Sequence, residues 1–347
     1  MNISEFDYEL PEELIAQMPA DKRENSKMLV LDKDSKTIEH KHFFDIVNYL
    51  DKNCLLVLNN TKVLPARLYG TKDTGAKIEV FLLEAKQGKQ WSCLIKPSKR
   101  IKPDTIITIC DELQVKAIEK LEDAGEWLVE LIYEGNLFDI LHKVGNIPLP
   151  PYIERKLQSE EIKQFDMNRY QTVYAKDEGS VAAPTAGLHF TQEILEALKN
   201  KGVEIAYVTL NVGLGTFRPV KCENILEHKM HSETFEITKE AADTINKAKK
   251  EGKKIVAVGT TTVRTLETAF QKYGCIKECH DHSELFIYPP YEFKVIDELI
   301  TNFHLPKSTL LMLVSALAGK DFIFKAYQEA IKNKYRFFSY GDCMLIK

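Results

Sequence analysis

Two histidines in the C-terminal half of the chain lie in segments rich in small and polar residues. His189 ends the run Val-Ala-Ala-Pro-Thr-Ala-Gly-Leu-His, and His304 lies in Thr-Asn-Phe-His-Leu-Pro, close to Asn302. Imidazole titrates near neutral pH, so both histidines are candidates for proton transfer. Small residues near Thr185 and Gly187 would let a ligand approach the main chain. The alternative is that both are hydrogen-bonded structural histidines.

A strand expected at 203–210 leads into a loop that contains Gly213 and Gly215. Glycines after a strand leave room for a ligand. The loop has Gly-x-Gly without a third glycine, and no helix clearly follows, so it is not a dinucleotide-binding fingerprint. A simple glycine bend is the alternative to a binding loop.

A second strand, expected at 254–258, turns through Gly259 into a helix with hydroxyl groups in its first turn. Unpaired N–H groups at a helix start suit a carboxylate or phosphate, and an arginine adds a planar fork of donors. The segment lacks Gly-Lys-Ser/Thr and is not a P-loop, and helix capping by threonine is the alternative. The candidate substrate-binding residues here are Thr260, Thr261, Thr262 and Arg264.

Metal-ligating residue types also cluster, but without the spacing of a known site. His228, His231 and Glu233 do not follow His-Glu-x-x-His. A second cluster is irregularly spaced, so we expect a chance grouping in a loop and no metal, while metal binding there is left open. This second cluster consists of Cys275, Cys279, His280 and His282.

The composition excludes several classes of protein. The 347 residues are 44% hydrophobic and 28% charged, which is typical of a globular protein, and the length favours two domains. The net charge of -4 excludes a protein that coats nucleic acid through a general positive field, so RNA contacts must be local. Seven cysteines suggest no disulfide framework. Without a signal peptide or a long apolar segment, we expect a soluble, cytoplasmic protein.

Short apolar runs separated by glycine and proline fill the region from 66 to 133 and predict an antiparallel β-barrel or sandwich. The five expected strands are Lys77–Leu83, Trp91–Ile95, Thr105–Ile109, Leu113–Ile118 and Trp127–Tyr133.

Strands and helices alternate in the rest of the chain. Thr191 and Thr238 are suited to cap helices that end before Gly202 and Gly252. Such alternation is typical of an α/β domain, into which we expect the β-rich part to be inserted. Further helices are expected at 43–50, 263–273, 307–318 and 321–334, and further strands at 54–58 and 254–258.

Several longer motifs occur in one order along nearly the whole chain. They include Leu-Asn-Asn-Thr-Lys-Val-Leu-Pro-Ala-Arg-Leu at 58–68, the three segments around His189, Gly259 and His304, and runs at 147–153, 170–174, 286–289 and 335–342. Together they resemble the S-adenosylmethionine:tRNA ribosyltransferase-isomerases of queuosine biosynthesis. Pro290 replaces an expected glycine, and the Cys/His cluster is outside the pattern.

The resemblance implies a discontinuous α/β barrel-like domain, residues 1–63 and 150–347, with a small antiparallel β-barrel domain inserted at 64–149. It implies an enzyme that transfers and isomerises the ribosyl moiety of S-adenosylmethionine onto 7-aminomethyl-7-deazaguanine (preQ1) at the tRNA wobble position. Adenine and methionine leave, and the product is epoxyqueuosine in tRNA. S-adenosylmethionine is consumed as co-substrate, with no bound cofactor. The expected partner is a tRNA with a GUN anticodon, and the protein is expected to be a monomer.

The chemistry suggests roles for the candidate residues. His189 and His304 would transfer protons, with His231 as a third candidate. Arg264 and the three threonines would hold the methionine carboxylate, and the loop with Gly213 and Gly215 would contact the nucleoside. The expected tRNA contacts are Asn59, Asn60, Arg67, Lys96, Lys99 and Arg100, although a solvated charged face also explains the basic residues.

Two other functions are compatible with parts of the sequence. A tRNA methyltransferase would use the same co-substrate and yield S-adenosylhomocysteine, but its Rossmann-type glycine fingerprint is not found. A non-catalytic tRNA-binding protein would need no site rich in histidine and small residues.

Overall fold

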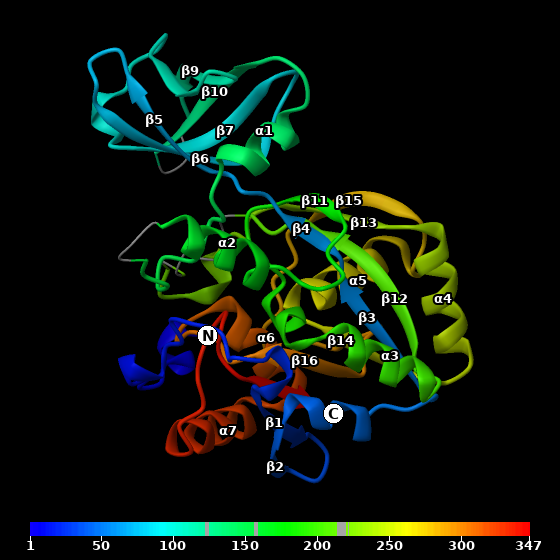
Figure 1. The fold of residues 1–347 in the computed structure, drawn as a ribbon. Helices are drawn as coiled ribbons and strands as arrows, with labels where there is room; N and C mark the ends of the chain where they lie inside the picture. Colours follow the sequence, from blue (N-terminus) through cyan, green and yellow to red (C-terminus); the bar gives the residue numbers. More distant parts are fainter. Residues whose placement is uncertain (122–124, 156–158, 214–219, 221) are drawn as a thin grey trace.

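The protein consists of a small β-barrel that stands on a larger α/β body (Figure 1). The computed structural model describes residues 1–121, 125–155, 159–213, 220 and 222–347. No helix in these ranges is long and apolar enough to cross a membrane. The 3-10 helices are η1 (Ile3–Phe6), η2 (Glu12–Leu14), η3 (Arg23–Asn25), η4 (Phe43–Asn48), η5 (Ser98–Arg100), η6 (Thr185–His189) and η8 (Ile225–Glu227).

The barrel closes in the order β10-β7-β6-β5-β8-β9, and every pair in it is antiparallel. The five strands expected here are confirmed, while β5 was not predicted because its sequence is short and largely polar. Gly70 in β5 is required by close packing, since a Cβ there would lie 2.5 Å from the carbonyl oxygen of Thr108 in β8. The strands are β5 (Arg67–Lys72), β6 (Lys77–Ala85), β7 (Gln90–Lys96), β8 (Ile106–Cys110), β9 (Leu113–Lys120) and β10 (Glu126–Tyr133).

The body is built on a nine-stranded mixed sheet in the order β15-β13-β12-β3-β14-β16-β17-β1-β2. Its centre, β12-β3-β14-β16, is parallel throughout, so the carboxyl ends of these four strands meet at one edge. The strands are β1 (Lys27–Asp32), β2 (Thr37–His42), β3 (Cys54–Asn59), β12 (Glu204–Leu210), β13 (Glu233–Ile237), β14 (Lys254–Val258), β15 (Cys279–Ser283), β16 (Glu298–Asn302) and β17 (Cys343–Ile346).

Both faces of this sheet are covered. Along β3, Leu55 and Val57 pack into a core with α4 to α7, whereas Leu56 and Leu58 pack into a second core with η4 and α3. This alternation explains the continuous apolar sequence of the strand. The predicted caps are confirmed by hydrogen bonds from backbone N–H groups to the hydroxyls that begin α3 and α4. The helices are α3 (Gln192–Asn200), α4 (Lys239–Lys250), α5 (Thr260–Tyr273), α6 (Thr309–Ala318) and α7 (Lys320–Lys332).

The chain leaves the body after β4 (Thr61–Val63), forms the barrel, and returns through α1 (Leu137–Val144) and α2 (Glu160–Arg169) to β11 (Asp177–Ser180). β4 and β11 pair with each other in parallel. The expected fold class, an α/β protein with an inserted antiparallel β-barrel, is therefore confirmed. The exact domain boundaries at residues 63/64 and 149/150 stay a prediction.

Candidate active site

The signature segments converge at the carboxyl edge of the parallel strands. Gly259 follows β14, Asn302 ends β16, and Val212 lies just after β12. η6, which carries Thr185, packs against β16, although Thr185 and its partner Asn302 are 117 positions apart in the sequence. In open α/β sheets ligands bind outside the carboxyl ends of strands, so this edge is the expected place for a site.

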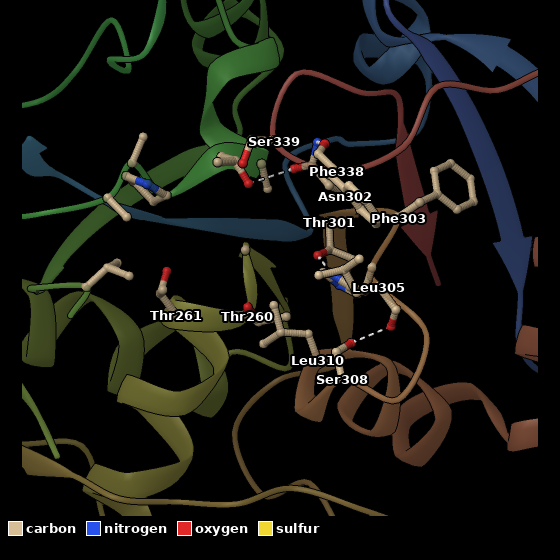
Figure 2. A pocket seen from close by; sticks show the side chains of 18 of the residues that line it. Thr260, Thr261, Thr301, Asn302, Phe303, Leu305, Ser308, Leu310, Phe338 and Ser339 are labelled. Atoms are coloured by element: carbon tan, nitrogen blue, oxygen red, sulfur yellow. Dashed lines mark hydrogen bonds between the residues drawn. The ribbon is translucent and has the colours of Figure 1, made fainter. Parts of the chain in front are cut away.

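A pocket of about 100 Å³ lies at this edge (Figure 2). Segments that are far apart in the sequence form its walls. Most of the lining side chains are small, hydroxyl-bearing or aromatic. The lining residues are Tyr152, Ala182, Ala183, Pro184, Thr185, Ala186, Val212, Gly259, Thr260, Thr261, Thr301, Asn302, Phe303, His304, Leu305, Ser308, Leu310, Phe338 and Ser339.

His304 lines the pocket directly and is held in one orientation. Its Nε2 lies 3.1 Å from the hydroxyl of Thr301, and its backbone N–H donates to the hydroxyl of Tyr327 at 3.0 Å. Burial lowers the pKa of His304 from 6.5 to about 3. The imidazole is therefore neutral near pH 7 and can accept a hydrogen bond there, while the same burial disfavours its uptake of a proton.

Asn302 connects the pocket to His189. Its Nδ2 lies 3.2 Å from Nε2 of His189 and donates to the carbonyl of Phe338 at 3.1 Å, while its Oδ1 accepts from the hydroxyl of Thr185 at 3.2 Å. Burial, and then the charges of Arg336 and Arg23, lowers the pKa of His189 to about 3. His189 does not line the pocket. It lies behind Asn302, beside a smaller cavity of about 20 Å³.

The first turn of α5 supplies the hydroxyls of Thr260 and Thr261 to the pocket. Gly259 precedes the helix with φ 85°, a value that favours glycine, and its residue type lets the strand turn sharply into the helix. The helix starts three residues earlier than expected from the sequence, so Thr260 and Thr261 of the pocket lining belong to its first turn, where backbone N–H groups lack intrahelical partners. This arrangement suits an anionic group of a ligand.

Arg264 differs from the expectation that it holds the carboxylate. Its side chain is 7% exposed and forms a buried ion pair with Glu233, and Nη2 donates to the carbonyl of Ser283 at 3.2 Å. Glu233 also accepts from the backbone N–H of Gly213 at 2.9 Å. The ion pair thus holds the carboxylate of Glu233 in place, and this carboxylate binds the backbone of Gly213 at the start of the glycine loop. Only the separate residue types, 31 positions apart, were visible in the sequence.

Four other expected ligand contacts are placed differently. Thr262 is buried and donates to the carbonyl of Val258 at 2.7 Å. Gly187 is needed for packing, because a Cβ there would lie 2.1 Å from the hydroxyl oxygen of Tyr174. Gly213 is held by its bond to the buried glutamate and does not line the pocket, and His231 is exposed and lies outside the pocket lining. Gly215 lies outside the described residues.

The expected tRNA contacts separate into two groups. Asn59 is fully buried, and its side-chain amide bonds with Leu210 and Thr261, so it links β3, β12 and α5. Because it is buried, a direct RNA contact is excluded for it in this structure. Asn60 is half-buried and donates to Asp177 at 2.9 Å. The remaining four, Arg67, Lys96, Lys99 and Arg100, lie on the barrel.

Tyr152 and Ser339 are pocket residues that were not predicted individually, although both fall in motifs of the resemblance. Their hydroxyls are 2.6 Å apart, and burial raises the pKa of Tyr152 to about 12. In the described ranges no group of three or more histidine, cysteine or acidic side chains has the geometry of a metal site.

Comparisons with known proteins agree with the geometry. The family model for queuosine biosynthesis proteins matches residues 3–346. The S-adenosylmethionine:tRNA ribosyltransferase-isomerase of Clostridioides difficile (strain 630) is 53% identical over 348 residues, covering all of both chains. The crystal structure of a Thermotoga maritima S-adenosylmethionine tRNA ribosyltransferase is 41% identical, covers 99% of this chain and 100% of its own, and has a TM-score of 0.57. The chain therefore belongs to the queuosine biosynthesis protein family.

Proposed function

We propose that the chain transfers and isomerises the ribosyl moiety of S-adenosylmethionine onto preQ1 at the wobble position of tRNA. Adenine and methionine are released, and epoxyqueuosine is formed in the tRNA. The observation that carries this proposal is the end-to-end match to the relative from Clostridioides difficile. The pocket supports it, because its walls are formed by the segments on which the family resemblance rests.

The pocket residues suggest a division of roles. The sulfonium of S-adenosylmethionine acidifies the neighbouring C5′ hydrogens, and we assign His304 to accept one of these protons because it is the histidine among the residues that line the pocket. The first turn of α5, with Thr260 and Thr261, holds the methionine carboxylate. His189 acts through Asn302, which it touches. The pocket volume of about 100 Å³ is below the ~300–1,000 Å³ of typical ligand sites, so the co-substrate extends beyond it.

The proposal also covers the anticodon of the tRNA, the oligomeric state and location of the enzyme, and its need for a cofactor. The tRNA carries a GUN anticodon, the enzyme works as a monomer in the cytoplasm, and S-adenosylmethionine is consumed without a bound cofactor. Sedimentation of the free protein at several concentrations tests the monomer, and a set of tRNAs with different anticodons tests the anticodon requirement.

The decisive experiment incubates purified protein with S-adenosylmethionine and tRNA that carries preQ1, followed by mass spectrometry of small molecules and digested nucleosides. Adenine, methionine and epoxyqueuosine are the expected products. Formation of S-adenosylhomocysteine would instead indicate a methyltransferase. Binding of tRNA without consumption of S-adenosylmethionine would indicate a non-catalytic protein.

A further inference from the structure

A second cavity, of about 290 Å³, lies where the barrel meets the body. Arg67 and Tyr69 of β5 form its wall on the barrel side. Arg155 and residues of α2, including Lys163, form the opposite wall. The volume is near the lower end of the ~300–1,000 Å³ of small-ligand sites.

Tyr69 has the position of a stacking platform. Arg67 and Tyr69 alternate with the buried Leu68 along β5, so both project from the outer surface of the barrel. Tyr69 is 37% exposed and also lines an open groove of about 760 Å³ on the barrel, together with Lys77 and Lys96. The ring thus lies at the junction of the cavity and the groove. Aromatic rings beside basic side chains are the usual means of binding single-stranded nucleic acid.

Among the basic side chains of the cavity, Lys163 is the one best suited to contact an anionic group. Arg155 is bound through two nitrogens to Asp166, at 2.8 and 2.9 Å, so these two charges offset each other. The ammonium of Lys163 donates to a backbone carbonyl at 3.2 Å, which satisfies a hydrogen bond but leaves the charge available. Nε of Arg67 is buried without a hydrogen-bond partner in the described part of the chain, and it lies 3.9 Å from a carboxylate oxygen of Glu79. Glu160 also lines the cavity, and with Glu79 beside Arg67 there are three acidic side chains for three basic ones, so the attraction of an anion rests mainly on Lys163.

The cavity is close to the candidate active site. Tyr152 lines the active-site pocket and Ile153, the next residue, lines the cavity, with Cα atoms about 3.8 Å apart. Ile147 and Leu149 of the cavity wall belong to the same packed cluster as Ala183 of the pocket wall. The two sites are therefore lined by consecutive residues of one segment and share one packed cluster, so they are neighbours in the structure.

We propose that this cavity binds an anticodon-loop nucleotide next to the one that reacts in the pocket. The base stacks on Tyr69, and its phosphate is contacted by Arg67 and Lys163. The inference rests on the proposed function, because it takes the substrate to be a tRNA. It adds a second recognition site that holds the loop while the wobble base occupies the pocket.

The test compares Tyr69→Ala and Tyr69→Phe, with Phe138→Ala as the control, since Phe138 is also 37% exposed and lies on α1 away from both hollows. Binding of a fluorescent anticodon stem-loop carrying preQ1 is measured by anisotropy. Tyr69→Ala should weaken binding by about tenfold or more, Tyr69→Phe should bind nearly as the wild type, and the control should not change. The KM for S-adenosylmethionine should be unaffected in all three, which excludes misfolding.

A second measurement uses Lys163→Gln, with Lys120→Gln on the outside of the barrel as its control. The slope of log affinity against log salt should fall by about 0.7 for Lys163→Gln alone, as expected for one lost phosphate contact. Binding is measured without turnover, so a failure of the proposed reaction leaves this test valid. Wild-type affinity in both Tyr69→Ala and Lys163→Gln, or no binding of the stem-loop by the wild type, would overturn the inference.

Discussion

His189 and Asn302 are 113 residues apart in the sequence and meet in the core, with Nε2 of the histidine 3.2 Å from Nδ2 of the asparagine. The same amide nitrogen donates to the carbonyl of Phe338, and the amide oxygen accepts from Thr185. Asn302 therefore holds two other segments, η6 and the segment of Phe338, against the end of β16.

Replacement of Asn302 by alanine should lower kcat for adenine release by about 100-fold, since a displacement of about 1 Å in an active site can have this effect. Thr185→Val removes only one of the contacts and should have a smaller effect. Steady-state adenine release measures both, and urea unfolding shows whether the variants are folded. Unchanged turnover in Asn302→Ala would contradict the aligning role.

The free energy of unfolding should depend on pH through His189 and His304. The pKa of each is lowered from 6.5 to about 3 in the folded state, so the unfolded chain binds more protons between these values. The stability is complete above pH 6.5 and is lost as pH falls towards 3, by about 1.4 kcal/mol per pH unit for each histidine. Urea unfolding at pH 7 and pH 5 measures this loss, and His304→Gln should make it smaller. An equal loss in the variant and the wild type would show that His304 does not titrate in this way.

Removal of one member of the Glu233–Arg264 ion pair should destabilise the protein by about 3–5 kcal/mol, because it leaves an uncompensated charge in the core. The double variant Glu233→Leu with Arg264→Met should regain much of this stability. Thermal and urea unfolding measure the energies. The double variant should still bind S-adenosylmethionine more weakly than the wild type, because Gly213 has lost the acceptor for its N–H.

Gly187→Ala should destabilise the protein by about 1–3 kcal/mol, the usual effect of overpacking a core. The added Cβ would lie 2.1 Å from the hydroxyl oxygen of Tyr174 and 2.8 Å from a methyl group of Thr172. Tyr174→Phe in the same chain should restore part of the loss, since it removes the nearest atom. Additive effects of the two substitutions in urea unfolding would argue against this contact as the cause.

Local signals were enough to predict most elements of the fold. Thr191 and Thr238 are predicted as helix caps, because a capping side chain bonds to a backbone N–H only a few residues further along the chain. Both caps are confirmed. Five barrel strands followed from their apolar patterns. β5 (Arg67–Lys72) is not predicted from the sequence, because most of its residues are polar and it has no run of apolar residues. Its pairing with β6 and β8 makes it a strand.

The site was predictable as a set of segments and less so residue by residue. His304, Thr260 and Thr261 line the pocket as expected. The sequence assigns Arg264 to a carboxylate because of its fork of donors, and the resemblance assigns Asn59 to tRNA. Both are buried and bonded to partners distant in the sequence. Long-range pairing of this kind leaves no spacing pattern in a single sequence.

The parallel pairing of β4 and β11, with Thr61 opposite Asp177, has a consequence for how this architecture can change over evolutionary time. The chain departs from the body and rejoins it at one place, so the inserted module can be lengthened, trimmed or exchanged without altering the strand order around it. Substitutions in the barrel therefore fall on a different set of residues from those that form the pocket. The barrel and the α/β body can thus diverge at different rates within one gene.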